Sequence, residues 1–182
     1  MSSNSQSSSK SVDFSALVYG SLVCSLLEMT ENVEDVNKKL DDIGYRIGLR
    51  LAHEFALDRN IEMIDTPEKL INDVLIKNWP IISGKTSIAQ LTVLKNKNWP
   101  QEPSEYLIHF DESIFTRNVT IPELYQNVQF TAMLPGALRG IFEVFQYEAT
   151  VTLEANNQNE TGTTVHIICN REIPPAIPKD DD

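Results

Sequence analysis

The stretch VEDVNKKLDDIGYRIGLRLAHEFALDR, residues 33–59, decides the fold because its pattern is that of one long helix. Its apolar residues follow one another at spacings of three or four, the period of a helix with one buried face. These residues are Val33, Val36, Leu40, Ile43, Ile47, Leu51 and Phe55. Gly44 and Gly48 lie one turn apart, and each costs about 1 kcal/mol relative to alanine in a helix interior. Two glycines at this spacing predict a close helix crossing, with a flexible spot as the alternative.

Two further helices are predicted on either side of this one. A helix that begins at Asp13 or Ser15 and runs to about Met29 is apolar nearly all round, which predicts burial on more than one side. A third helix begins after Thr66, which is a suitable N-cap because a proline follows it at the first helical position. This third helix is expected to end before Pro80.

A fourth helix is predicted for residues 121–146. Pro135 lies inside it, so a kink or a break is expected at Leu134. The segment GALRG, residues 136–140, gives this helix a smooth face of small residues, namely Gly136, Ala137 and Gly140. Packing of that face on a sheet is the leading interpretation. A surface that another subunit or an apolar ligand approaches closely is the alternative.

Two pairs of strands complete the pattern. Residues 86–95 and 105–111 are rich in β-type residues, and residues 149–155 and 163–170 alternate between apolar and polar. The predicted element order is therefore ααα-ββ-α-ββ. Segregated helices and strands indicate an α+β fold, in which helices pack on a small antiparallel β-sheet.

The chain divides into a domain and two flanking segments. Residues 1–12 are Ser-rich and polar, which predicts a disordered tail. Residues 13–171 are interpreted as a single domain, since a chain of this length suits one hydrophobic core. Residues 172–182 are Pro-rich and acidic, which predicts an extended C-terminal arm.

Composition narrows the classes of partner and the compartment. The net charge of −11 disfavours nucleic acid and an acidic membrane surface as partners. The two cysteines, Cys24 and Cys169, lie far apart, which fits a reducing cytosol better than a disulfide scaffold. The N-terminal stretch lacks the apolar core of a signal peptide, and no apolar run of ~20 residues is present to span a bilayer.

No catalytic or metal-binding constellation is readable in the sequence. The three histidines, His53, His109 and His166, lack the spacing of a zinc site. No serine lies in a Gly-x-Ser-x-Gly elbow, and the segment at residues 84–87 lacks the first glycine of a P-loop. Cys24 is interpreted as a small core residue. We therefore expect a protein without catalytic residues or bound metal, which acts by binding partners.

Several segments together resemble one known family. They are residues 17–23 (LVYGSLV), 35–40 (DVNKKL), 43–51 (IGYRIGLRL), 136–140 (GALRG) and 172–174 (EIP). In combination they resemble the Bet3 family of subunits of the TRAPP vesicle-tethering complex. The resemblance covers most of the chain from Phe14 onward and is loosest over residues 78–126.

The resemblance implies a non-enzymatic subunit of α+β fold that acts in ER-to-Golgi vesicle transport. Its implied partners are other small TRAPP subunits, bound pairwise through helices as a heterodimer or a homodimer. A Rab GTPase is an implied partner of the whole complex, which promotes nucleotide exchange on it. The implied location is cytoplasmic, peripheral to cis-Golgi and endoplasmic reticulum membranes through the complex only. No cofactor is implied.

The resemblance and the residue pattern together assign two candidate surfaces. The first is a helix-packing or subunit interface within the chain or between chains, formed by Leu17, Gly20, Cys24, Gly44 and Gly48. The second is a GTPase-facing arm, which the resemblance implies for Ile173, Pro174, Pro175, Asp180, Asp181 and Asp182.

One departure from the family concerns a cysteine. Family members typically carry one between the second and third helices, where it holds an acyl chain in an internal channel. The matching segment here, residues 61–65 around Met63 and Ile64, contains no cysteine, so acylation there is chemically impossible. The implied channel residues are Met63, Leu70, Val74, Gly136, Ala137 and Gly140. We hypothesise that the channel is absent, is plugged, or binds a free lipid such as a fatty acyl chain non-covalently. A module that binds lipids or apolar small molecules is the alternative function.

Overall fold

The helix predicted from residues 33–59 is α2, Val33–Asp58, and its start is fixed by a reciprocal cap. The Asn32 side-chain oxygen accepts a hydrogen bond from the backbone N–H of Asp35 at 2.8 Å. The Asn32 amide donates in return to the Asp35 carboxylate, also at 2.8 Å. Such a pair satisfies an N–H group that the helix itself leaves without a partner. The sequence TEN before residue 33 therefore separates α2 from the helix before it.

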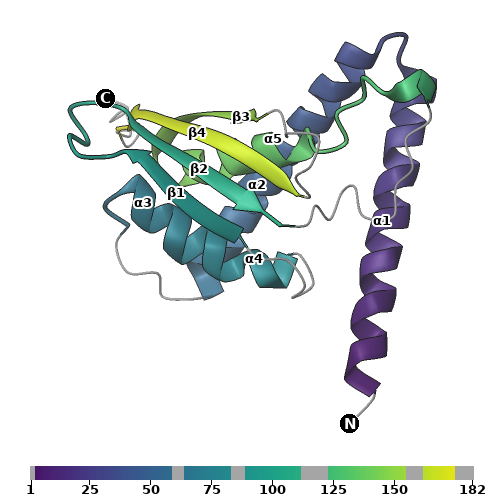
Figure 1. Ribbon diagram of the computed structural model, residues 1–182, viewed down its shortest axis with the longest axis horizontal. Coiled ribbons are helices and arrows are strands. Elements are labelled where there is room, and N and C mark those ends of the chain that lie inside the picture. The colour runs from purple at the N-terminus through teal and green to yellow at the C-terminus, as the bar shows by residue number, and fades with distance from the viewer. Residues whose placement is uncertain (1–2, 59–63, 83–88, 112–122, 155–161, 175–182) are drawn as a thin grey trace, which may run out of the picture.

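The computed structural model describes residues 3–58, 64–82, 89–111, 123–154 and 162–174. Its elements occur in the predicted order (Figure 1). Besides α2 they are α1 (Ser3–Met29), α3 (Pro67–Leu70), a π-helix (Ile71–Ile76), α4 (Lys77–Ile82), β1 (Ala89–Lys95), β2 (Ser104–Phe110), a 3₁₀ turn (Glu123–Tyr125), α5 (Met133–Val144), β3 (Tyr147–Leu153) and β4 (Thr163–Glu172).

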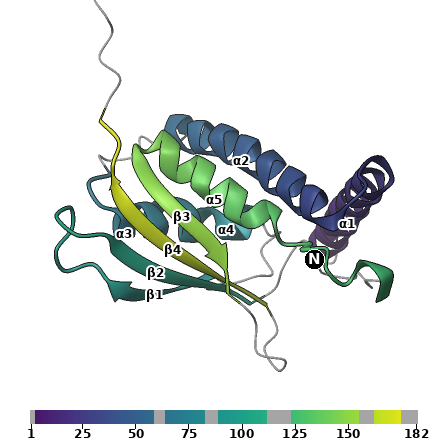
Figure 2. The same cartoon turned by 90° about the horizontal axis from the view of Figure 1, so that it is seen from above.

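The four strands form one antiparallel sheet in the order β1-β2-β4-β3, with helices over one of its faces (Figure 2). Side chains of β2 and β4 alternate between the two faces, as the period of a strand requires. The inward ones form the main core with residues of the helices, and the largest of them are Tyr106, Ile108, Phe110, Val165 and Ile167. The predicted α+β class, with helices on a small antiparallel sheet, is confirmed.

The third helix begins as predicted but does not end before Pro80. Thr66 is its N-cap, and the Thr66 hydroxyl accepts a hydrogen bond from the Lys69 N–H at 3.3 Å. The helix then widens into the π-helix, and α4 continues through Pro80 to Ile82. The missing N–H of Pro80 falls where the hydrogen-bonding pattern is already changing from π to α. The helix therefore continues past the proline.

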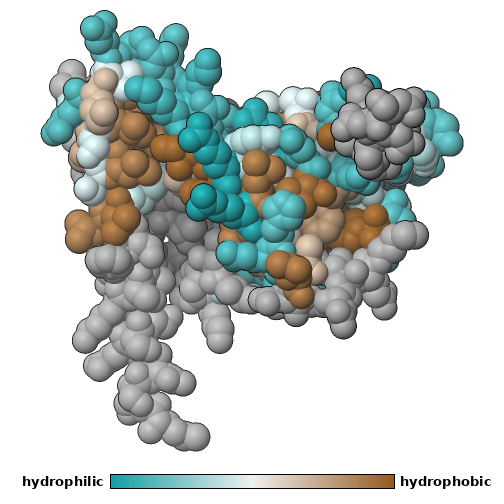
Figure 3. Space-filling view, turned by 180° about the vertical axis from the view of Figure 1, so that it is seen from behind, coloured by the Kyte–Doolittle hydropathy of each residue, from teal (hydrophilic) through white to brown (hydrophobic). Residues whose placement is uncertain are grey.

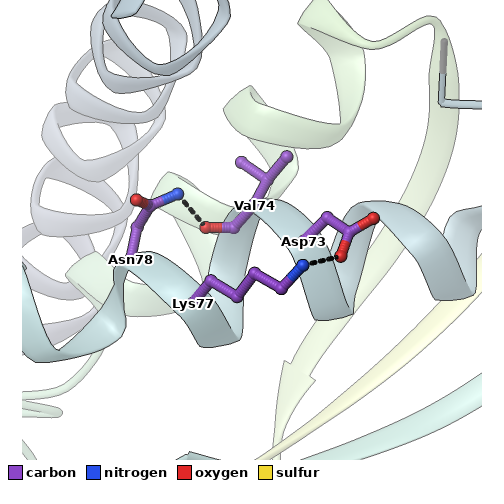
Figure 4. Close-up of polar contacts among 4 residues, drawn as sticks. All are labelled: Asp73, Val74, Lys77 and Asn78. Carbon is purple, nitrogen blue, oxygen red and sulfur yellow. Dashed lines mark hydrogen bonds and ion pairs between the residues drawn. The ribbon is translucent and has the colours of Figure 1, made fainter. Parts of the chain in front are cut away.

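The buried residues of this helix repeat every four positions. They are Pro67, Leu70, Ile71, Val74, Leu75, Asn78 and Trp79. Asn78 is the one amide among them, and its Nδ2 donates to the Val74 carbonyl at 2.6 Å, beside the exposed Lys77–Asp73 ion pair (Figure 4). An ideal α-helix repeats every 3.6 residues, so a strict period of four would drift off the core face. The wider π-helix corrects that drift.

The fourth helix is shorter than predicted. α5 begins at Met133, and the residues before it form the 3₁₀ turn and irregular structure rather than the helix expected from residue 121. Pro135 consequently lies in the first turn of α5. Backbone N–H groups in a first turn have no helical partner, so a proline there removes no hydrogen bond. A kink or a break was expected at Leu134, but Leu134 lies in the first turn of α5, where the helix begins.

α1 differs from its prediction at both its start and its surface. It begins at Ser3, whereas a disordered tail was expected over residues 1–12. Residues 3–12 contain neither glycine nor proline, so nothing in their composition stops a helix from continuing. The helix is also not buried on more than one side. Leu17 is 70% exposed, and the helix packs through one stripe around Tyr19 and Val23.

Candidate functional site

The glycines of α2 face the backbone of α5 where the two helices cross. A Cβ added to Gly44 would lie 2.8 Å from the Met133 carbonyl carbon. One added to Gly48 would lie 2.7 Å from the Ala137 carbonyl carbon. Carbon atoms pack at about 3.5–4.0 Å, so neither position has room for a side chain. Gly44 and Gly48 thus belong to a close crossing within the chain.

The glycines of α5 complete the same crossing from the other side. A Cβ on Gly136 would lie 2.9 Å from the Asp41 carbonyl carbon, and one on Gly140 would lie 2.9 Å from the Leu49 nitrogen. The smooth face of α5 therefore packs on α2, and the expected packing on the sheet is wrong for these residues. Larger α5 side chains such as Leu138 and Phe142 fill the sheet side of the helix instead.

Polar contacts fasten the solvent-facing edge of the crossing. Arg139 of α5 forms an ion pair with Asp41 of α2. The Tyr45 hydroxyl of α2 donates to the Glu143 carboxylate of α5 at 2.7 Å. This hydrogen bond, followed by the partial burial of the ring and the charge of Glu143, raises the pKa of Tyr45. These two contacts join α2 and α5 at the solvent-facing edge of the crossing.

An apolar cavity of about 190 Å³ lies between the α2–α5 pair and the helix formed by the π-helix and α4. The residues that line it carry no polar side-chain group apart from the indole of Trp79. They are Ile47, Leu51, Leu75, Trp79, Phe110, Met133, Leu134, Ala137, Leu138 and Ile141. Ile47 is 39% exposed, so it marks the side on which the cavity meets solvent. An enclosed apolar cavity of roughly 150 Å³ binds ligands such as benzene, so the volume of this more open cavity suits a small apolar ligand.

Most of the residues expected to line a channel lie elsewhere. Ala137 lines the cavity, but Leu70 and Val74 are fully buried in the core and are not among its walls. Gly136 and Gly140 face α2, and Met63 lies outside the described residues. The sequence reasoning missed the wall formed by α2. Ile47 and Leu51 were recognised only as periodic apolar residues, and their alignment opposite Ala137 depends on the crossing geometry.

Neither cysteine of the chain lines the cavity. Cys169 of β4 is fully buried, and burial, followed by the charge of Glu172, raises its pKa from 9.0 to about 12. Cys24 of α1 is exposed, so its expected role as a small core residue is wrong. The chain has two cysteines in all. No thiol is therefore placed to hold a ligand covalently in this cavity.

The outward face of α1 is largely exposed among the residues that the structure describes. Leu17 and Val18 are 70% and 52% exposed, and Cys24 lies one turn beyond Gly20. A Cβ added to Gly20 would meet no atom within 4 Å. In Figure 3, hydrophobic colour covers much of the described part of α1, the upright part of the molecule at the left of the view. Leu17, Gly20 and Cys24 are thus separated from Gly44 and Gly48, with which they had been grouped.

The start of the C-terminal arm is held by the sheet. The Ile173 N–H donates to the Gln146 carbonyl at 2.6 Å, which extends the pairing of β4 with β3 by one residue. Gln146 has a positive φ of 65° at the end of α5. Pro174 is the last arm residue described. The predicted arm residues Pro175, Asp180, Asp181 and Asp182 lie outside the described part of the chain.

The described residues contain neither a cluster of metal ligands nor a helix suited to cross a membrane. Over residues 3–58, 64–82, 89–111, 123–154 and 162–174, no three His, Cys, Asp or Glu side chains gather as metal ligands would. Within the same ranges, none of the helices combines the length and apolar character that crossing a membrane requires. His166 instead contacts Glu105 at 2.7 Å on the outer face of the sheet.

Known proteins resemble this chain over nearly its whole length. A subunit 3 homolog of the trafficking protein particle complex from Caenorhabditis briggsae is 26% identical over 177 residues, which cover 94% of this chain and 91% of that protein. The complex subunit BET3 of Saccharomyces cerevisiae is 25% identical over 166 residues, which cover 87% and 82%.

A solved structure has the same fold. It is a crystal structure of a trafficking protein particle complex subunit 3 from Naegleria fowleri covalently bound to palmitic acid. Its TM-score is 0.76 at 21% identity, with 91% of this chain and 99% of that chain covered. Residues 15–170 match the family described as transport protein particle (TRAPP) component. The chain therefore belongs to the family of TRAPP components.

Proposed function

We propose that this chain is a non-catalytic subunit of a trafficking protein particle complex, and that the outward face of α1 binds a neighbouring small subunit. The relatives whose names identify them as subunits of that complex support the assembly. The exposed apolar face of α1 is the observation that carries the proposal. The partner is a different subunit of the same family, with a second copy of this chain as the alternative.

The chemistry of the face suits a helix of another protein. Residues 14–27 contain no charged side chain, so a partner meets no charge to desolvate there. Full burial of an exposed leucine or valine stabilises an interface by about 1.5–3 kcal/mol per side chain. Gly20 leaves open space through which a second helix can approach closely. Glycines likewise allow the close approach of α2 and α5 inside this chain.

The assembled complex gives the chain its wider role. In this proposal it acts in ER-to-Golgi vesicle transport from the cytoplasmic side of cis-Golgi and endoplasmic reticulum membranes, which it meets through the complex. The complex promotes nucleotide exchange on a Rab GTPase, and the arm from Ile173 to Asp182 faces that GTPase. Three aspartates near a nucleotide pocket would disfavour bound phosphates by like-charge repulsion.

The interface is tested by comparing two charged substitutions. Leu17→Lys places a charge on the outward face of α1, whereas Leu57→Lys changes a residue that is 84% exposed at the end of α2. Both variants should melt at the wild-type temperature, because neither side chain is packed. Affinity purification from the protein's own cells, followed by mass spectrometry of intact complexes, should lose the small partner subunits for Leu17→Lys alone. Unchanged recovery of partners with Leu17→Lys contradicts the proposal.

The arm is tested separately on the assembled complex. Removal of residues 175–182 should slow nucleotide exchange while the subunits still co-purify, because the contact that the arm makes at Ile173 is retained. Replacing Asp180, Asp181 and Asp182 together by asparagine isolates the contribution of charge. An exchange rate equal to that of the intact complex would reject a role for the arm.

A second function is supported by the cavity. We propose that it binds a small apolar molecule or the end of a fatty acyl chain without a covalent bond. Apart from the Trp79 indole the walls are apolar and carry no positive charge to pair with a carboxylate, so we expect an acyl headgroup to remain on the Ile47 side. Native mass spectrometry and thermal melting with decanoic acid test this. A rise in melting temperature for the wild type and none for the cavity-filling variant Ala137→Leu supports it, whereas no rise for either rejects it.

A further inference from the structure

We infer that the base of the C-terminal arm is a docking site for a protein segment that carries lysine or arginine beside an apolar side chain. The site consists of two grooves, here called the arm-base grooves. The larger, of about 590 Å³, lies between the start of α3 and the end of β4. The smaller, of about 360 Å³, lies over α2, α5 and β3. Nothing in the proposed assembly through α1 uses this surface.

The two grooves form one continuous surface because they share two wall residues. Tyr147 and Ile173 line both of them. The Tyr147 side chain is 4% exposed, and its hydroxyl donates to the Ile64 carbonyl at 3.4 Å. The Trp99 ring packs edge-on against the Tyr147 ring, with centroids 5.9 Å apart. Tyr147, which separates the two grooves, is therefore fixed in place by contacts with Ile64 and Trp99.

The floor of the larger groove is apolar. Ile64, Phe145 and Ile173 are half-buried there, and Pro174 is exposed at its edge. Apolar side chains that remain partly open to solvent gain free energy when a partner covers them. The floor therefore favours an aliphatic or aromatic side chain on the partner.

The rim of the grooves is acidic, and its negative charge is only partly neutralised. The carboxylates on it are Asp42, Asp65, Glu143, Glu148 and Glu172. Glu148 is paired with Arg171 at 2.6 Å, and the one arginine of the walls, Arg139, is paired with Asp41. Among the described residues no cation pairs with Asp42, Asp65 or Glu172. Burial, followed by the charge of Glu172, raises the pKa of Tyr147 to about 12.

Charge complementarity decides the occupant. Phosphates, acidic lipid headgroups and acidic peptides would be repelled by this rim. The chain's own tail is disfavoured for the same reason, since residues 175–182 carry three aspartates against one lysine and are net negative. A basic side chain would satisfy the rim while an adjacent apolar one covers the floor, which gives both steering and affinity.

The test uses the isolated full-length chain, so it does not depend on assembly through α1. A short fluorescent peptide with lysine and arginine around a leucine and a phenylalanine is titrated by anisotropy, beside a version with glutamate in place of every basic residue. The double variant Asp65→Asn with Glu172→Gln removes two rim charges. Glu28→Gln with Glu54→Gln removes the same net charge from exposed sites elsewhere.

We expect the basic peptide alone to bind, and to bind more weakly when salt is raised from about 0.05 to about 0.5 M. The rim variant should weaken binding roughly five- to tenfold, and the control variant should not change it. Hydrogen exchange of the wild-type chain should show peptide-dependent protection at residues 145–147 and 172–174. Equal weakening by both double variants, or protection elsewhere, would mean non-specific attraction to an acidic protein and would overturn the inference.

Discussion

Gly48 of α2 lies directly on the backbone of Ala137 in α5, with no space for even one methyl group between the two helices. Ala137 in turn is a wall of the apolar cavity. The crossing therefore sets the position of the cavity wall as well as the distance between the helices. A change at Gly48 is transmitted to the cavity through the backbone of α5.

Gly48→Ala should destabilise the fold strongly. The added methyl carbon would lie 2.7 Å from the Ala137 carbonyl carbon and 2.9 Å from its Cα, and neither backbone atom can rotate away. Overpacking of this kind costs about 1–3 kcal/mol, and Gly48→Leu should cost more. Urea denaturation measures the loss.

Gly20→Ala is the matched control for that substitution. It is also a helix-interior glycine, but an added Cβ meets nothing within 4 Å. Alanine should therefore stabilise the isolated chain by roughly 0.5–1 kcal/mol. Equal effects of the two substitutions would mean that helix propensity, and not the crossing, decides the outcome at Gly48.

Gln146→Gly should stabilise the protein. Gln146 has a φ of 65° where α5 turns into β3, a conformation that costs a residue with a Cβ about 1–2 kcal/mol. Glycine removes that cost and loses part of the gain to the larger freedom of the unfolded chain, so about 1 kcal/mol should remain. Thermal melting measures the gain. Gln146→Ala keeps the steric cost, and a gain of the same size with alanine would contradict this account.

Stability should fall in alkali because of Cys169. Burial raises its pKa from 9.0 to about 12 in the folded chain. Above about pH 9 the unfolded chain therefore loses this proton while the folded chain keeps it, so the free energy of unfolding decreases as pH rises towards 12. The decrease from one thiol is at most about 1.4 kcal/mol per pH unit.

Two alanine variants isolate this contribution. Cys169→Ala should have a lower stability at neutral pH but a shallower fall between pH 9 and pH 11, measured by urea denaturation at each pH. Cys24→Ala should keep the wild-type fall, because Cys24 is exposed in the folded chain. Identical slopes in all three proteins would assign the alkaline loss to other groups, such as Tyr147.

The sequence predicts where helices and strands form better than it predicts what each of them packs against. The period of α2 and the capping residue Thr66 depend on neighbouring positions alone, and both were found where expected. The helix boundaries predicted from Pro80 and Pro135 were wrong. The free-energy cost of a proline in a helix depends on whether its missing N–H would have had a hydrogen-bond partner. The packing of Gly136 depends on which element lies opposite, and no local pattern contains that information.

The candidate surfaces show the same limit. An apolar pattern around α1 predicts that partners exist, but it does not say whether they are in this chain or another. Tyr19 and Val23 are buried within the chain, whereas Leu17 is exposed. The residues that line the cavity come from α2, the π-helix, α4, β2 and α5, so tertiary packing and not a local pattern brings them together.

The π-helix makes one stretch of the chain unusually tolerant of a missing residue. A π turn holds one residue more than an α turn. Deleting the exposed Asn72 would convert the π turn into an ordinary α turn. The helical segments before and after it would then keep their buried faces turned towards the core. Deleting Arg46 from α2 would instead rotate everything after it by about 100°. Urea denaturation should show the smaller loss for Asn72, and loss of the fold by both deletions would refute this. Relatives whose chains are one residue shorter here would therefore keep the same core.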